Sequence, residues 1–98
     1  MYTIVWRFTV RPGRNSEFEQ HYGPDGSWAA LFRKAPGYLG TRLYRDVSTP
    51  GMYVTVDQWE SEAAFAAFLG QHRGEYEALD KRFADLTVSE ERLTAGLP

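Results

Sequence analysis

Two histidines are the side chains of this sequence best suited to exchanging protons near neutral pH. His72 lies four residues before Tyr76 on the apolar stripe of an expected helix, so both side chains project from one face. Glycines beside His72 predict a helix break, which could open the mouth of a cavity. We therefore take His72 and Tyr76 as the candidate catalytic residues. His21 stands at the expected end of another helix and is interpreted as a surface histidine.

A high aromatic content accompanies these candidates. Phe, Trp and Tyr make up 15% of the 98 residues, which leaves bulky side chains for a ligand pocket or an apolar interface. Ordinary core packing is the competing interpretation of each of these side chains. The residues expected to line a substrate pocket between helices and sheet are Trp6, Tyr22, Trp28, Phe32, Phe65 and Phe68.

Composition argues against several classes of function. With no cysteine, the chain has no disulfide, thiolate metal ligand or cysteine nucleophile. Neither histidine has a second histidine or a carboxylate at a convincing metal-ligand spacing, so we expect no metal site. The net charge is -2, and its 11 basic and 13 acidic residues are interspersed, which argues against a nucleic-acid partner.

The chain contains no apolar run near the length of a membrane span and no basic-then-apolar leader. Its first ten residues alternate apolar and polar types, which is typical of a strand. We therefore expect a cytoplasmic location and no membrane association.

The first half of the chain predicts a strand, an interrupted helix and a hairpin. Residues 2–10 alternate with one wholly apolar face, and Ser16 with Glu19 has the spacing of a helix capping box. The run Gly23–Gly26 interrupts that helix, and Ser27 is expected to cap its continuation, which ends before Pro36. Strands 38–47 and 52–59 form an antiparallel hairpin around a four-residue turn.

Ser61 is the expected cap of the second helical region, whose apolar residues keep a 3-4 spacing with a bend near Gly70. Residues 86–93 predict the last strand. The order β, α, β, β, α, β is the split βαβ arrangement of a ferredoxin-like α+β fold, in which a four-stranded antiparallel sheet carries its helices on one face. We expect residues 1–98 to form a single domain.

One face of such a sheet has no helices. We expect Val5, Tyr53 and Trp59 on that uncovered face, where a second copy of the chain would pack to form a homodimer. Charges within sheet strands are seldom buried unpaired, so we also expect Arg7 and Asp57 to pair across strands on the dimer side. A bulky indole at a strand end, such as Trp59, is interpreted as primarily structural.

The sequence resembles the antibiotic biosynthesis monooxygenase domains, small dimeric αβ-barrel proteins, over nearly its whole length. The resemblance rests on the order and spacing of the segments FTVRPGRNSEFEQHY, APGYLGTRLYRD, YVTVDQWESEAAFAAF and EYEALD. It implies that Trp59-x-Ser61 is a family motif, present whether or not a member is catalytic. Members of the family include cofactor-free oxygenases of phenols and quinols, haem-degrading enzymes and proteins without an established activity.

The resemblance implies a cofactor-independent monooxygenase acting on a small aromatic phenol, quinol or polyketide-type substrate, with no metal or flavin. Such an enzyme needs a dry aromatic cavity, a base for the phenol and a polar group near the developing oxygen charge. Haem degradation is disfavoured, because the family's haem-site positions here carry Trp6, Phe68 and Ala78 or Leu79. The alternative is a non-catalytic dimeric domain that binds a small ligand or serves an accessory or stress-response role.

Overall fold

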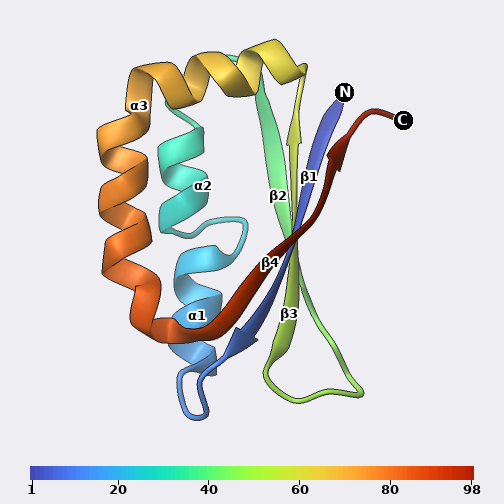
Figure 1. The fold of residues 1–98 in the computed structure, drawn as a ribbon, viewed down its shortest axis with the longest axis vertical. Helices are drawn as coiled ribbons and strands as arrows, with labels where there is room; N and C mark the ends of the chain where they lie inside the picture. Colours follow the sequence, from blue (N-terminus) through green and yellow to red (C-terminus); the bar gives the residue numbers. More distant parts are fainter.

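The computed structural model describes all residues from Met1 to Pro98 (Figure 1). Its elements, in chain order, are β1 (Tyr2–Val10), α1 (Asn15–Tyr22), α2 (Ser27–Phe32), β2 (Tyr38–Arg45), β3 (Met52–Trp59), α3 (Glu62–Phe83), a 3-10 turn (Ala84–Leu86) and β4 (Thr87–Gly96). None of the helices is long and apolar enough to cross a membrane.

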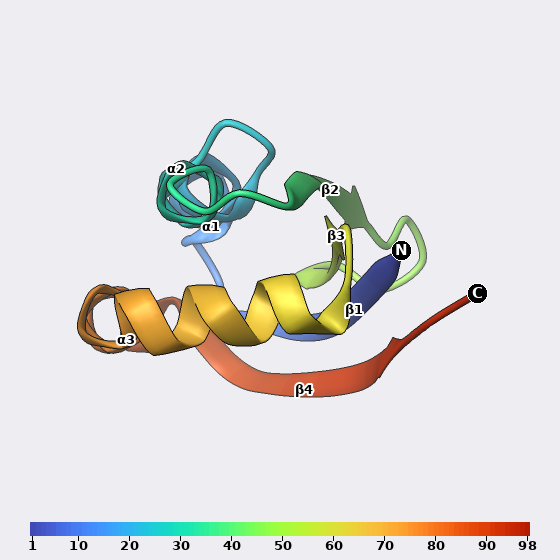
Figure 2. The same ribbon diagram turned by 90° about the horizontal axis from the view of Figure 1, so that it is seen from above.

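The four strands form one antiparallel sheet in the order β2-β3-β1-β4. All helices lie on one side of it, as the edge-on views show: α1 and α2 follow one another on one flank and α3 lies on the other (Figures 1 and 2). This arrangement confirms the predicted ferredoxin-like α+β fold. The opposite face of the sheet carries no helix (Figure 1).

The interruption between α1 and α2 is confirmed, but the caps expected there are wrong. Helix α1 begins at Asn15, and Ser16 lies inside it without capping it. Ser27 is the first residue of α2, and its hydroxyl is hydrogen-bonded to Nδ1 of His21 at 2.7 Å. The ring of His21 also stacks on Phe83 at 4.3 Å, so this histidine is part of the packing between α1 and α3 and not a free surface group.

Helix α3 begins and bends as its sequence indicates. The hydroxyl of Ser61 accepts a hydrogen bond from the backbone N–H of Ala64 at 3.0 Å, which confirms Ser61 as the N-cap. At His72 the backbone leaves the helical conformation, with φ -125° and ψ 23°. The predicted break is therefore present, between Gly70 and Gly74.

The orientation predicted for β3 is wrong. Antiparallel pairing places Tyr2 opposite Trp59 and Phe8 opposite Tyr53, and residues opposite one another share a face of the sheet. Tyr53 and Trp59 therefore point toward the helices, where they are 1% and 0% exposed. Trp59 packs against four rings at centroid distances of 5.2–5.6 Å, those of Phe32, Tyr38, Phe65 and Phe68.

The same register separates Arg7 from Asp57, so the predicted pair does not form. Arg7 lies opposite Val54 on the uncovered face and makes an ion pair with Glu91. Asp57 lies opposite Ile4 on the helix-covered face. The uncovered face instead presents the aliphatic side chains of Val5, Val54 and Val56, which neighbour one another across β1 and β3.

Candidate active site

A cavity of about 60 Å³ lies between the inner face of the sheet and helices α2 and α3. Strands β1, β2, β3 and β4 and helices α1, α2 and α3 all contribute to its wall. Its lining residues are Ile4, Trp6, Phe8, Tyr22, Trp28, Phe32, Thr41, Thr55, Asp57, Phe65, Tyr76, Asp80 and Glu90.

Most of the residues predicted for a pocket meet in this one cavity. The six predicted residues that line it are Trp6, Tyr22, Trp28, Phe32, Phe65 and Tyr76. Phe68 lies behind the wall, fully buried against Phe32 and Trp59. These aromatic residues recur at every second position in the strands and at every third or fourth position in the helices, so each set lies on one face of its element. In this fold those faces meet, which brings the rings together.

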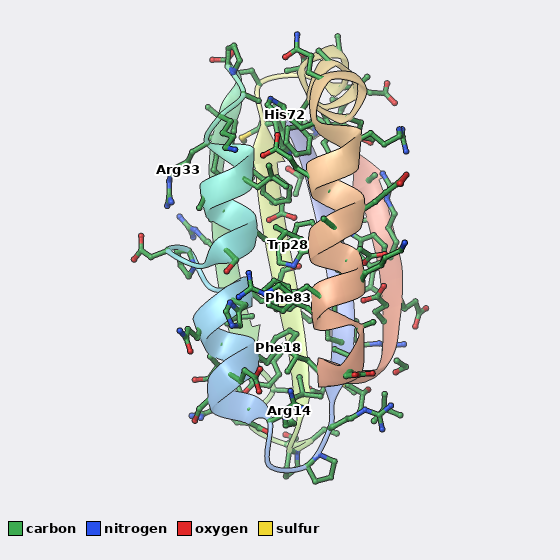
Figure 3. All side chains as sticks on the ribbon, turned by 90° about the vertical axis from the view of Figure 1, so that its left-hand side faces the viewer. Arg14, Phe18, Trp28, Arg33, His72 and Phe83 are labelled. Carbon is green, nitrogen blue, oxygen red and sulfur yellow. The ribbon has the colours of Figure 1, made fainter.

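His72 does not line the cavity. Its Nδ1 is 2.8 Å from Oε1 of Glu75, its ring stacks on Phe68 at 5.4 Å, and its side chain is 19% exposed. Glu75 also forms an ion pair with Lys34. Figure 3 shows His72 at the kink of α3, away from Trp28, which lies between the two helical flanks. A catalytic role for His72 stays a prediction that variants must test.

Asp57 is the cavity residue that sequence reasoning assigned to the wrong face. It is 9% exposed, and its Oδ1 accepts a hydrogen bond from the Thr41 hydroxyl at 2.6 Å. The Tyr38 hydroxyl lies 2.6 Å from the same Thr41 oxygen. The sequence places Asp57 on the same strand face as Tyr53 and Trp59, so its position depended on which face of β3 meets the helices.

Burial controls the protonation of this site. It raises the pKa of Asp57 from 3.8 to about 6, and the hydrogen bond from Thr41 offsets only part of that effect. Burial likewise raises the pKa of Tyr22 to about 12 and increases the pKa of Tyr76. Both phenols therefore stay protonated near neutral pH, while Asp57 can change its protonation state there.

The indole N–H of Trp28 is the one buried side-chain polar group without a hydrogen-bond partner. It lies near the Tyr22 hydroxyl and offsets part of the rise that burial causes in that phenol's pKa, but the contact falls outside the geometry of a hydrogen bond. Trp28 is 9% exposed and lines the cavity. A donor from α2 and an acceptor from β3 thus border the same space.

A second, wider hollow of about 290 Å³ adjoins the first and runs between the end of α3 and β4. The two share Tyr22, Asp80 and Glu90. Burial raises the pKa of Glu90, and the negative charge of Asp80 raises it further. The passage from the wide hollow to the narrow one is therefore acidic, which disfavours a ligand that carries a negative charge there.

Metal-ligating side chains do not gather in this structure: no group of three His, Asp or Glu residues is placed to hold an ion. The polar groups of the mostly aromatic cavity wall are the buried carboxylate of Asp57, phenol and threonine hydroxyls, an indole N–H, and the carboxylates of Asp80 and Glu90.

The chain belongs to the antibiotic biosynthesis monooxygenase family, whose model matches residues 1–78. Among solved structures it is similar to SnoaB of Streptomyces nogalater, described as a cofactor-independent oxygenase, at 30% identity over 99% of this chain and 94% of that one, with a TM-score of 0.69. A single-residue variant of SnoaB aligns at 28% identity over 99% and 91%, with a TM-score of 0.73.

A Deinococcus radiodurans protein classed with the same monooxygenases has 19% identity over 100% of this chain and 92% of that one, with a TM-score of 0.76, which supports the fold. No curated protein sequence matches the chain.

Proposed function

We propose that this protein is a cofactor-independent monooxygenase that oxidises a small aromatic phenol or quinol in the cavity beneath its helices. The observation that carries the proposal is an aromatic cavity bordered by one buried carboxylate, Asp57, and one unpartnered donor, Trp28. The family of the chain and its likeness to SnoaB supply the reaction class.

In such a reaction the substrate itself supplies the electrons for O₂. For an anthrone, the ring methylene loses two hydrogens and gains one oxygen atom, and the second oxygen atom leaves with those hydrogens as water. The protein contributes dry aromatic walls that hold the ring and groups that control the proton of the substrate hydroxyl. Tyr76 borders the cavity as a protonated hydroxyl and can hydrogen-bond the substrate oxygen.

The dimensions of the two hollows suggest how a substrate would lie. The inner cavity of about 60 Å³ is the smaller of the two, so we place the hydroxylated edge of a ring there. The remainder of a larger molecule would occupy the outer hollow of about 290 Å³ along β4. The acidic residues between them, Asp80 and Glu90, favour a substrate without a carboxylate at that point.

Filling the inner cavity should abolish turnover while leaving the fold intact. Thr55 is 4% exposed and lines the cavity, so Thr55→Leu places extra carbon atoms in the space meant for the ring. We expect oxygen uptake with dithranol, an anthrone, to be faster with metal-free wild-type protein than in buffer alone. For Thr55→Leu we expect kcat/KM to be at least about tenfold lower than for the wild type. Thr49→Leu in the exposed β2–β3 turn is the matched control and should retain full activity.

Circular dichroism of both variants establishes that they fold. No oxygen uptake by the wild type with quinols or anthrones, combined with tight binding of these compounds, would replace the proposal with the ligand-binding alternative. In the same assay, His72→Ala and Tyr76→Phe test the predicted catalytic pair. His72 lies outside the cavity wall. A fall in kcat for His72→Ala would therefore mean that the substitution acts on the cavity indirectly, through the kink of α3.

We propose further that two copies pack through the uncovered sheet face, where Val5, Val54 and Val56 form an aliphatic surface. Val56→Lys would place an ammonium group in that contact, at a cost large enough to separate a dimer at micromolar concentration. Sedimentation should give a dimer for the wild type and a monomer for the variant, while Thr49→Lys stays dimeric. A monomeric wild type, or a Val56→Lys protein that remains dimeric, would contradict this arrangement.

A further inference from the structure

We propose that Asp57 is the base that takes the proton from the substrate hydroxyl, that Thr41 positions its carboxylate, and that the N–H of Trp28 hydrogen-bonds the oxygen that becomes charged. This inference rests on the proposed function and deepens it, because it assigns the proton transfer to a residue outside the sequence-predicted pair. It follows from two polar groups of the cavity wall that keep a free hydrogen-bonding atom, the Asp57 carboxylate on the sheet and the Trp28 indole on α2.

The two oxygens of the Asp57 carboxylate have different surroundings. Oδ1 is held by the Thr41 hydroxyl at 2.6 Å. Oδ2 makes no hydrogen bond to the protein, and it is not among the atoms enclosed without a partner, so it is open to the cavity that Asp57 lines. One oxygen is therefore fixed and the other is available to a bound hydroxyl group.

The hydrogen bonds behind Asp57 have a defined direction. The Thr41 hydroxyl has a single hydrogen, which it donates to Asp57. The Tyr38 hydroxyl must therefore donate to the Thr41 oxygen. This chain from β2 to β3 fixes both the Thr41 hydroxyl and the carboxylate plane. Thr41 is thus a positioning residue, because its one hydroxyl hydrogen is committed to the Asp57 carboxylate.

No cation lines the cavity to lower the basicity of Asp57. The titratable groups that face it are Tyr38 behind Thr41, Tyr22 from α1, Tyr76 and Asp80 from α3, and Glu90 from β4. Arg33 and Arg92 act on Tyr38 and Tyr76 but do not line the cavity. The carboxylate is consequently a stronger base than an exposed aspartate, and its pKa of about 6 leaves it ionised at neutral pH.

Trp28 supplies an independent reason to place the substrate oxygen here. Buried N–H groups nearly always have a partner, and the indole of Trp28, itself nine-tenths buried, has none. A substrate oxygen in the cavity would satisfy that donor from the side of the helices while its proton faces Asp57 on the sheet. As the hydroxyl ionises, the negative charge grows beside the indole N–H, which stabilises it.

The proton transfer balances without any additional group. The O–H bond of the substrate breaks, an O–H bond forms on Asp57, and the bonding electron pair stays on the substrate oxygen as a phenolate. In an anthrone this hydroxyl is that of the enol tautomer, which forms when one methylene hydrogen moves to the carbonyl oxygen. The former methylene carbon of the phenolate forms a C–O bond with O₂, the oxidant of the proposed reaction, and Asp57 returns its proton to the resulting peroxide. Loss of the remaining C–H proton then breaks the O–O bond, so that the carbon becomes a carbonyl, the second oxygen atom leaves as water and the carboxylate is restored.

The test compares Asp57→Asn, Thr41→Val and Trp28→Phe with the wild type, using oxygen uptake with dithranol and equilibrium binding of naphthol. Asparagine keeps the shape and the acceptor for Thr41 but is not a base. We expect Asp57→Asn to lower kcat about 100-fold or more while the Kd for naphthol stays within about threefold of the wild-type value. The reason is that the base acts in the transition state and not in the ground state.

The pH dependence of kcat/KM distinguishes a catalytic base from a residue that only supports the fold. Wild-type kcat/KM should rise with pH through the ionisation of Asp57 near 6 and then level off, and Asp57→Asn should lose that limb. Thr41→Val should shift the limb to higher pH, since it removes a hydrogen bond to the charged form. Trp28→Phe should lower kcat about tenfold or more without moving the limb.

A wild type that turns over dithranol alongside an Asp57→Asn protein with the same rate and pH limb would overturn this assignment and leave the proposed function standing. A wild type that consumes no oxygen would instead remove the proposed function, and the assignment with it. The two failures are therefore distinguished by the wild-type rate alone.

Discussion

Replacing Trp59 with alanine is expected to lower the free energy of unfolding by about 4 kcal/mol, the scale of a buried tryptophan truncation. Its indole is 0% exposed and touches the rings of Phe32, Tyr38, Phe65 and Phe68, so the cavity left behind would be walled by rigid aromatic side chains from every layer. Urea unfolding followed by circular dichroism measures the change.

The matched control is Trp59→Phe, which keeps a ring in the same site and should cost less than half as much. Since domains of this size have about 5–15 kcal/mol of net stability, the alanine variant should lose between about a quarter and four fifths of it. A loss below about 1 kcal/mol for Trp59→Ala would contradict the structural role assigned to the strand-end indole.

Asp57→Asn is expected to stabilise the folded protein at pH 8. The pKa of Asp57 is about 6 in the folded chain, above its ordinary 3.8, so the folded state binds this proton more tightly than the unfolded state does. The free energy of unfolding therefore loses nothing to the burial of Asp57 well below pH 4, where the group is protonated in both states. The loss grows as the pH rises toward 6 and is constant above it.

Asparagine removes that cost, so we expect a gain of about 2 kcal/mol at pH 8, or a rise in Tm of about 10 °C, and almost no gain near pH 3. Thermal unfolding at the two pH values measures it, with Asp46→Asn in the exposed β2–β3 turn as the control that should gain nothing. Equal effects of Asp57→Asn at both pH values would show that the carboxylate is not buried as described. A buried charged group that lowers the free energy of unfolding is characteristic of a functional site.

Much of the fold could be predicted from the sequence. The bounds of β1 and β3 follow from strict alternation ended by turn residues, and the interruption at Gly23–Gly26 follows from residues that cannot continue a helix. Ser61 was identifiable as a cap because its hydroxyl precedes an apolar 3-4 stripe. The caps of α1 and α2 were not, since Ser16 is the second residue of α1 and Ser27 is the first residue of α2.

The facing of β3 could not be decided by its own residues. Its two faces are both apolar enough to be buried: one carries Val54 and Val56, the other Tyr53 and Trp59. Pairing with β1 selects the aromatic face for the core, because that register brings Trp59 opposite Tyr2. Strand periodicity gives the alternation but not the register, and the register depends on the partner strand.

The candidate site shows the same division. The aromatic wall was predictable because each ring stands at a core-facing position of its own element. Asp57 was assigned to the wrong face together with the rest of β3, so the sequence offered histidine as the base. His72 does lie on the apolar stripe, yet the break at its own backbone leaves its ring against Phe68 and Glu75.

The central claim, oxygenation by the protein's own side chains, is tested most directly by isotopic labelling. Protein freed of metal by chelation is incubated with dithranol under ¹⁸O₂, and the product is analysed by mass spectrometry. The account predicts one labelled oxygen atom per product molecule, formed at a rate that Asp57→Asn abolishes. A product whose new oxygen comes from water, or one that forms only after metal or flavin is restored, would contradict it.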